Sequence, residues 1–295
     1  MPPFPLLRLP RLVLFDVFRS LSIAEKIKLS LCSKKISTQI YNDRLYSQKV
    51  IVSLDMINQG IRVHSENDKD AFKVFIDLDI WKRFYSNSGK TCQEGFLSVI
   101  RHLLQMFQCT ISTDLSFNNS DLYELTITEL VDLQVEFKAL NIVLDGSKDQ
   151  NLLWNQISSN FGLVENLKVL SDTTNPGFQP VFSSWPQNIS ISTSAWFTLE
   201  SLLACTSTKI ILLQSHLENK DLDEVLRKWR AGELPNLEYL YIGSHNIQTN
   251  RTTILGMNPL ELRGKVIQTD DGSKKATIKL SIFWIEMDVT PFEQT

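Results

Sequence analysis

The chain has 295 residues, of which 43% are hydrophobic and 21% are charged, and its formal net charge at pH 7 is -3. This composition is typical of a globular protein that buries one or two cores, and it differs from that of a disordered chain. Lys and Arg are scattered, so the sequence lacks the basic patch of a nucleic-acid-binding protein. No run approaches the roughly 18 apolar residues of a membrane span.

The cysteine pattern and the charged residues within the apolar N-terminal segment both indicate an intracellular, soluble protein. Charged residues interrupt the apolar start between positions 8 and 19, which argues against a signal peptide. The cysteines form no C-x-x-C pair, so we expect reduced thiols in the cytoplasm, the nucleus or both, and no metal or cofactor. The four cysteines are Cys32, Cys92, Cys109 and Cys205.

The first 40 residues predict three short helices with more apolar side chains than one core needs. Pro10 suits the first turn of a helix. Leu12 and Phe15 fall well away from the main stripe of that helix, so it needs cover on two sides. The main stripe contains Val13, Val17 and Leu21, widened by Leu14 and Phe18.

The second and third helices follow directly. Ser22 and Glu25 have the spacing of a capping box, so a helix should begin at Ser22. A polar break, "CSKK", separates this helix from the next. The helical stripes are Ile23, Ile27 and Leu31, and then Ile36 and Ile40. Such a small module is marginal alone and is stabilised when its second apolar face meets a partner.

Residues 4–44 resemble the F-box motif. The resemblance is carried by Leu9-Pro10, by the aliphatic stripe and by "AEKIKLSLCSKKI", and the sequence departs from it at residues 23–25, where many members have Pro and Asp. In that family the motif docks on the Skp-type adaptor of cullin-RING ubiquitin ligases. The resemblance implies docking or supporting roles for Leu9, Pro10, Val13, Val17, Phe18, Leu21, Ile27 and Leu31. The alternative is that these helices are ordinary core.

The next segment predicts strands and one amphipathic helix. Residues 49–56 and 71–81 are β-branched and aromatic runs bounded by polar loops. Thr91 and Glu94 have capping-box spacing before a helix that extends to about residue 108. The face of that helix comprises Phe96, Val99, Ile100, Leu103 and Phe107. His102 lies in the same helix, and we expect it to pack there without a catalytic role.

From about residue 135 a loose repeat predicts a strand–helix solenoid similar to leucine-rich repeats. Aliphatic pairs two residues apart recur about 21 to 30 residues along the chain, close to the period of such repeats. Helix-like stretches lie between them at 149–162 and 221–235. The pairs are Leu167/Val169, Ile189/Ile191, Ile210/Leu212 and Leu240/Ile242, with Ile142/Leu144 as a possible first member.

The C-terminal segment predicts a β-hairpin. Asp271-Gly272 marks a tight turn, and an alternating strand from Thr277 through Trp284 follows it. The 94–108 helix, "LPNLEYLYIG" and "DDGSKKATI" together resemble the type 2 F-box-associated domain of the large nematode F-box family. The expected fold is therefore α+β or α/β: an F-box at 4–44, linking strands and a helix at 50–134, and the repeat-like part at 135–290.

No catalytic motif is present: the sequence lacks phosphate-binding loops, zinc-protease signatures and nucleophile elbows. The resemblance implies a non-catalytic receptor that holds a Skp-type adaptor, and through it a cullin-RING ligase, at one end and a protein substrate at the other. Alternatives are an adaptor-independent repeat scaffold or regulatory module, and an enzyme with an unrecognised pocket.

Residues that alternate with the buried aliphatics should line the substrate-binding face, unless a flanking helix or the terminal hairpin covers them. These residues are Lys168, Leu170, Ser190, Ser192, Ile211, Leu213, Tyr239 and Tyr241.

Overall fold

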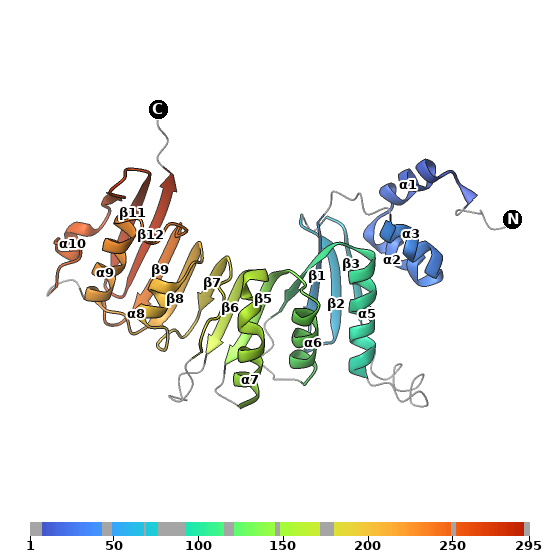
Figure 1. Cartoon of the computed structure of the whole chain (residues 1–295), viewed down its shortest axis with the longest axis horizontal. Coiled ribbons are helices and arrows are strands. Elements are labelled where there is room, and N and C mark those ends of the chain that lie inside the picture. The colour runs from blue at the N-terminus through green and yellow to red at the C-terminus, as the bar shows by residue number, and fades with distance from the viewer. Residues whose placement is uncertain are drawn as a thin grey trace. The chain divides into compact units, whose positions relative to one another are not determined.

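The computed structural model divides into two compact units, Met1–Lys138 and Ala139–Thr295 (Figure 1). The residues whose structure is described are 8–42, 49–67, 69–75, 92–114, 121–144, 148–171, 180–248 and 252–291.

The first unit begins with three short helices, as the sequence predicts: α1 (Arg11–Ser20), α2 (Ile23–Cys32) and α3 (Lys34–Asn42). Pro10 is the residue that precedes the first turn of α1. The capping box of α2 is complete, because the Ser22 hydroxyl accepts from the Glu25 N–H while the Glu25 carboxylate accepts from the Ser22 N–H. The sequence therefore places the starts of α1 and α2 correctly.

Four strands of the first unit lie in the order β4-β1-β2-β3. They are β1 (Val50–Asp55), β2 (Gly60–Ser65), β3 (Ala71–Phe75) and β4 (Cys109–Thr113). β1 is antiparallel to β2 and parallel to β4. Asp55 accepts hydrogen bonds from the N–H groups of Ile57 and Asn58, which fixes the β1–β2 turn. The sequence predicts β1 and β3 but misses β2 and β4, and the predicted part of β3 at 76–81 lies outside the described residues.

Two longer helices complete the first unit: α5 (Cys92–Met106) and α6 (Asp121–Asp132). The predicted face of α5 is buried at Phe96, Ile100 and Leu103. Thr91, the expected cap, lies outside the described residues, and α6 is not predicted by the sequence. Figure 1 shows α2 and α3 beside α5. The three-helix module is thus attached to the rest of its unit through α2 and α3.

Two polar contacts fasten α2 to this unit. The N–H of Ile23 donates to the Asp70 carboxylate at 2.8 Å, and the Ser30 hydroxyl lies 2.9 Å from Nε2 of His102 on α5. His102 therefore packs between helices, as its place in the amphipathic helix indicates. Burial lowers the pKa of His102 below its ordinary value of 6.5.

His102 should make the first unit less stable in mild acid. Because its folded pKa lies below its unfolded pKa, the unfolded chain takes up a proton first as the pH falls past about 6.5. Stability is therefore full above that pH and is lost below it. We expect His102→Gln, which cannot ionise, to reduce the loss measured by urea unfolding between about pH 7 and about pH 5.

The second unit is built on a sheet with strand order β5-β6-β7-β8-β9-β12-β11-β10. Strands β6 to β9 are parallel, whereas β12 is antiparallel to β9 and to β11. The strands are β5 (Phe137–Leu144), β6 (Val164–Ser171), β7 (Asn188–Ile191), β8 (Lys209–Ser215), β9 (Tyr239–Ser244), β10 (Val266–Gln268), β11 (Lys274–Ser281) and β12 (Trp284–Pro291).

Helices of the second unit lie on one side of these strands (Figure 1). They are α7 (Lys148–Ile157), the 3-10 helix η2 (Ser158–Leu163), α8 (Leu199–Ala204), α9 (Asn219–Arg230) and α10 (Pro259–Leu262). The two predicted helical stretches correspond to α7 with η2, and to α9. Gly232 follows the end of α9 with φ of +80°, a conformation that favours glycine, and its N–H donates to the Trp229 carbonyl.

The aliphatic pairs predicted from the sequence lie side by side on neighbouring strands. Leu167, Ile189, Ile210 and Leu240 form one row, and Val169, Ile191, Leu212 and Ile242 form the next. All eight are at most 2% exposed. The sequence thus identifies these strands and their register. That they form a leucine-rich-repeat-like solenoid stays an interpretation.

The C-terminal hairpin is present, but its second strand ends earlier than predicted. Gly272 adopts φ of +75° in the expected β10–β11 turn. The chain then turns again at Ile282-Phe283, and both side chains are exposed. The prediction of one continuous strand through Trp284 is therefore wrong. Because the new strand β12 pairs back onto β11, Ile285 and Met287 are buried and Trp284 lies on the opposite side of the sheet.

Candidate functional site

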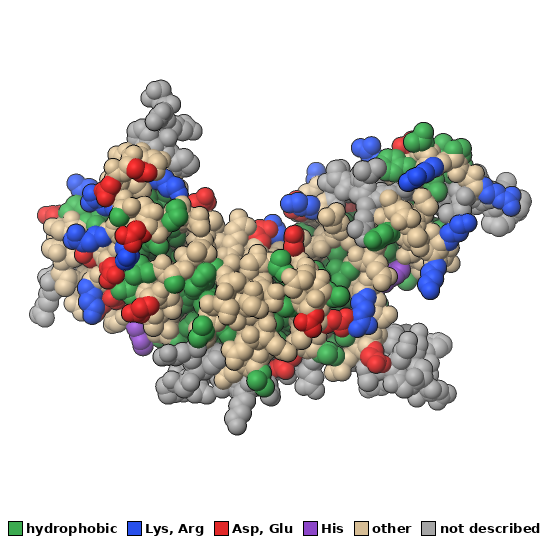
Figure 2. Space-filling view, in the orientation of Figure 1, with side chains coloured by type: hydrophobic (Ala, Val, Ile, Leu, Met, Phe, Trp, Pro, Cys, Tyr) green, Lys and Arg blue, Asp and Glu red, His purple; other side chains and the backbone are tan. Residues whose placement is uncertain are grey.

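Helix α1 has one buried face and several apolar side chains outside it. Leu14 and Phe18 are its buried residues. Leu12 precedes Leu14 by two positions, about 200° around the helix, and is 80% exposed. Val13 is 45% exposed. Figure 2 shows hydrophobic side chains gathered over α1. Exposed apolar side chains on a small helical module are what a partner-binding surface requires.

The eight residues expected to dock or support docking occupy different environments. Leu31, at the end of α2, is 71% exposed, and Pro10 and Val13 are also exposed. Leu9, Val17 and Leu21 are half-buried. Phe18 and Ile27 are buried, so in this conformation they can support the surface but cannot contact a partner. Leu12 was not among the eight, although its position off the main stripe is visible in the sequence.

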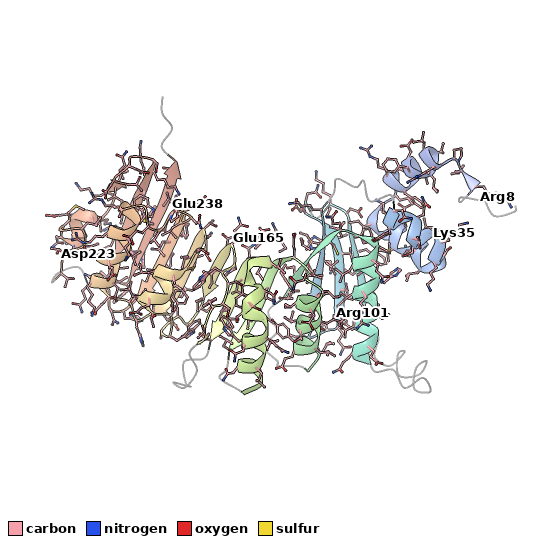
Figure 3. All side chains as sticks on the ribbon, in the orientation of Figure 1. Arg8, Lys35, Arg101, Glu165, Asp223 and Glu238 are labelled. Atoms are coloured by element: carbon pink, nitrogen blue, oxygen red, sulfur yellow. The ribbon has the colours of Figure 1, made fainter. Side chains whose placement is uncertain are left out.

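The helical module also carries a positive charge. In residues 8–42 the acidic side chains are Asp16 and Glu25, whereas the basic ones are Arg8, Arg11, Arg19, Lys26, Lys28, Lys34 and Lys35. Figure 3 marks Arg8 and Lys35 at this end of the unit. Because the whole chain has a net charge of -3, the module is basic against an acidic background.

The second candidate surface is the side of the second unit's sheet opposite the buried aliphatic rows. We call it the open face and define it by three rows across β6, β7, β8, β9 and β12. The first row is Asn166, Asn188, Lys209, Tyr239 and Asp288; the second is Lys168, Ser190, Ile211, Tyr241 and Glu286. The third contains Leu170, Leu213, Gly243 and Trp284.

The predicted substrate-binding residues share this face, and each is exposed or half-buried. Lys168 and Leu213 are exposed, while Leu170, Ile211, Tyr239 and Tyr241 are half-buried. Neither a helix of the second unit nor the terminal hairpin buries them. Trp284 and Lys209 also lie here and were missed. Opposite charges seven residues apart, at Lys279 and Glu286, could have revealed the turn that places Trp284 on this face, because these residues pair across β11 and β12.

The first unit also contains a hollow of about 560 Å³ between the C-terminal parts of α3, α5 and α6. Arg101 at its edge (Figure 3) is held by Glu129, which accepts from both Nε and one terminal nitrogen. Cys109 lines the same hollow, and burial raises its pKa to about 12, so its thiol stays protonated at neutral pH. The hollow therefore presents no activated nucleophile.

The described residues contain neither a candidate metal-binding site nor a candidate membrane-spanning helix. No group of three or more His, Cys, Asp or Glu side chains in these ranges could hold a metal ion. Likewise, none of the helices described above has both the length and the apolarity that a membrane crossing requires. The two surfaces that remain are a basic helical module with exposed apolar side chains and a mixed aromatic and charged sheet face. The class they indicate is a modular protein with two candidate binding surfaces.

Comparison with known families agrees with this division. Residues 6–48 match the F-box domain, and residues 178–242 match the family described as F-box associated. The chain thus carries an F-box domain near its N-terminus and an F-box-associated domain in its C-terminal part. No curated protein and no solved structure matches it. Together the two domains indicate, in general terms, a role in substrate recognition of the SCF type, and neither match is an enzyme family.

Proposed function

We propose that this chain is the substrate-recognition subunit of an SCF-type ubiquitin ligase. The helical module binds a Skp-type adaptor, which links it to a cullin-RING ligase, and the second unit binds the protein to be ubiquitinated. Such a complex would act in the cytoplasm, the nucleus or both.

The observation that carries the proposal is the division of apolar side chains on α1. Leu14 and Phe18 face inward, whereas Leu12 and Val13 remain exposed within the F-box match. When a partner covers these exposed side chains, the free energy falls by about 25 cal/mol for each Å² of apolar surface removed from water. Binding of an adaptor over these residues would therefore stabilise the helical module within the complex.

The chain makes and breaks no bond in this role. Its contribution is proximity: a target held on one surface and a ligase held through the other raise the effective concentration of target lysines near the ubiquitin-carrying enzyme. We further propose that the aligned strands of the second unit are degenerate leucine-rich-repeat-like elements. The support for this is the common register of their aliphatic pairs.

Charge placed on the exposed apolar residues should strongly weaken adaptor binding. We expect Leu12→Asp/Leu31→Asp to weaken the complex about 30- to 1000-fold, the usual cost of losing central interface anchors. Because both side chains are exposed, the variant should fold normally. Co-expression with a Skp-type adaptor, followed by pull-down and gel filtration, measures the effect.

The control is Ile57→Asp in the β1–β2 turn, which introduces one such carboxylate at a 51% exposed position of the same unit. It should bind the adaptor like the wild type. If folded wild-type protein forms no complex, or if both variants bind equally well, the adaptor role is wrong. An adaptor-independent scaffold would then be the better hypothesis.

A further inference from the structure

We infer that the open face binds an extended segment of a partner protein in which a carboxylate lies about three or four residues from an aromatic or large aliphatic side chain. The inference rests on the proposed function in one respect: the partner protein is taken to be the target of the ubiquitin ligase. Its physical basis is the separation of this face into a basic half and an aromatic half.

The basic half lies on β6, β7 and β8. Lys168 and Lys209 are both exposed, and within the described residues neither forms an ion pair. They are two strands and two residues apart, so their Cα atoms are separated by roughly 12 Å at ordinary sheet spacings. Between them lie Asn188 and Ser190 of β7. Nζ of Lys209 lies 4.8 Å from the ring centroid of Tyr239 on β9, so Lys209 must swing from that ring towards β7 for both cationic side chains to reach one acidic segment laid there.

The aromatic half lies on β8, β9 and β12. Tyr241 and Trp284 stack with ring centroids 5.9 Å apart, and Ile211 is the neighbour of Tyr241 in the same row. Gly243, opposite Trp284, has no side chain, and a Cβ there would lie 3.5 Å from Cε1 of Tyr241. The Tyr241 ring therefore lies close over Gly243, and because Tyr241 and Trp284 are both half-buried, part of the stacked pair remains exposed. Half-buried aromatic rings on an open sheet face are typical anchors for a partner's apolar side chain.

The charges beyond the aromatic half set the direction of the bound segment. Lys279 and Glu286 neutralise each other through a contact of 2.7 Å. Asp288 follows next to Tyr239 in the first row. An acidic partner residue would be repelled by Asp288 and attracted by Lys168 and Lys209. The acidic end of the segment should therefore lie over β7 and its apolar end over β9 and β12.

The spacing follows from the sheet. From β7 to β9 is about 10 Å and from β6 to β9 about 14 Å at ordinary strand separation, and an extended chain covers these distances in about three or four residues. A segment crossing the strands can thus place its carboxylate between the lysines and its apolar side chain against Tyr241 and Trp284.

A random-peptide phage library panned against the complete chain tests this inference. We expect enriched peptides to carry Asp or Glu about three or four residues from Trp, Tyr, Phe or Leu. Lys168→Glu/Lys209→Glu and Tyr241→Ala/Trp284→Ala should each weaken an enriched synthetic peptide about tenfold or more in fluorescence anisotropy. Replacing the acidic residue of the peptide by its amide should do the same. Lys265→Glu, a charge reversal at an exposed position off this face, should have no effect.

The inference is overturned by no enrichment, by basic or uncharged consensus sequences, or by binding that the two double variants leave intact. It is also overturned if gel filtration shows a dimer that these variants disrupt, because a second copy would then occupy the face. Adaptor pull-down with the same variants separates the two proposals. Retained adaptor binding with lost peptide binding supports both, whereas peptide binding without any adaptor binding removes only the ligase role.

Discussion

Replacing Trp154 with alanine is expected to lower the free energy of unfolding of the second unit by about 4 kcal/mol. Trp154 is fully buried on α7. Its ring meets those of Phe161 and Phe182 edge to face, with centroids 5.0 Å apart in both pairs, and its indole N–H donates to the Val181 carbonyl at 2.9 Å. Removing it would open a cavity and leave that carbonyl without its donor.

The cluster around Trp154 explains the size of this effect. Phe182 stacks on Trp185 at 4.3 Å and on Trp196 at 6.3 Å. These rings come from the connection between β6 and β7 and from the segment after β7, whereas α7, α8 and α9 cover the neighbouring connections. In the described part of the β6–β7 connection, aromatic side chains thus supply the packing that helices supply elsewhere.

Urea unfolding followed by circular dichroism measures the prediction. Leu152→Ala, on the same helix but at a 65% exposed position, should change stability by less than about 0.5 kcal/mol. Trp154→Phe keeps a ring but loses the N–H donor, so an intermediate loss of about 1–3 kcal/mol is expected. A loss below about 1 kcal/mol for Trp154→Ala would show that the cluster does not hold this unit together.

Elements with strong local signals could be predicted from the sequence. The capping box at Ser22 and Glu25 and the turn at Asp271-Gly272 depend on side chains close in sequence, and both are present. The aliphatic pairs of β6 to β9 are also local patterns, and their two-residue spacing fixes which face is buried. Side chains close in sequence are therefore sufficient to predict this helix start, this turn and the register of these strands.

Features that depend on distant partners could not be predicted in the same way. The turn at Ile282-Phe283 contains no typical turn residue, and β12 is defined by its pairing with β9 and β11. On α1, the apolar pattern alone does not tell whether Val13 or Leu14 faces inward, because the helix is apolar on more than one side. Packing against the other helices determines that Leu14 is buried and Val13 is exposed, and therefore which side chains are accessible to a partner.

Phe18→Ala is expected to release α1 from the first unit and to weaken adaptor binding indirectly. A Phe→Ala change at a fully buried position costs about 3–5 kcal/mol. Since Leu14 and Phe18 are the buried residues of α1, that loss falls on the attachment of one short helix. The strands and α5 should stay folded, because α2 makes its own contacts with Asp70, next to β3, and with His102 of α5. Hydrogen exchange should therefore increase across residues 11–20 and change little in α5.

Comparison with Leu12→Ala separates two ways of weakening adaptor binding. One is the unfolding of α1, and the other is the loss of a side chain that contacts the adaptor directly. Leu12 is 80% exposed, so its truncation should leave hydrogen exchange of α1 unchanged while weakening the adaptor complex directly. Phe18→Ala should change both measurements. If Phe18→Ala increases exchange but leaves adaptor binding intact, α1 is not the docking element, and exposed Leu31 on α2 becomes the principal candidate. If exchange stays low, α1 is held by contacts other than its buried pair, and the inward face assigned here is wrong.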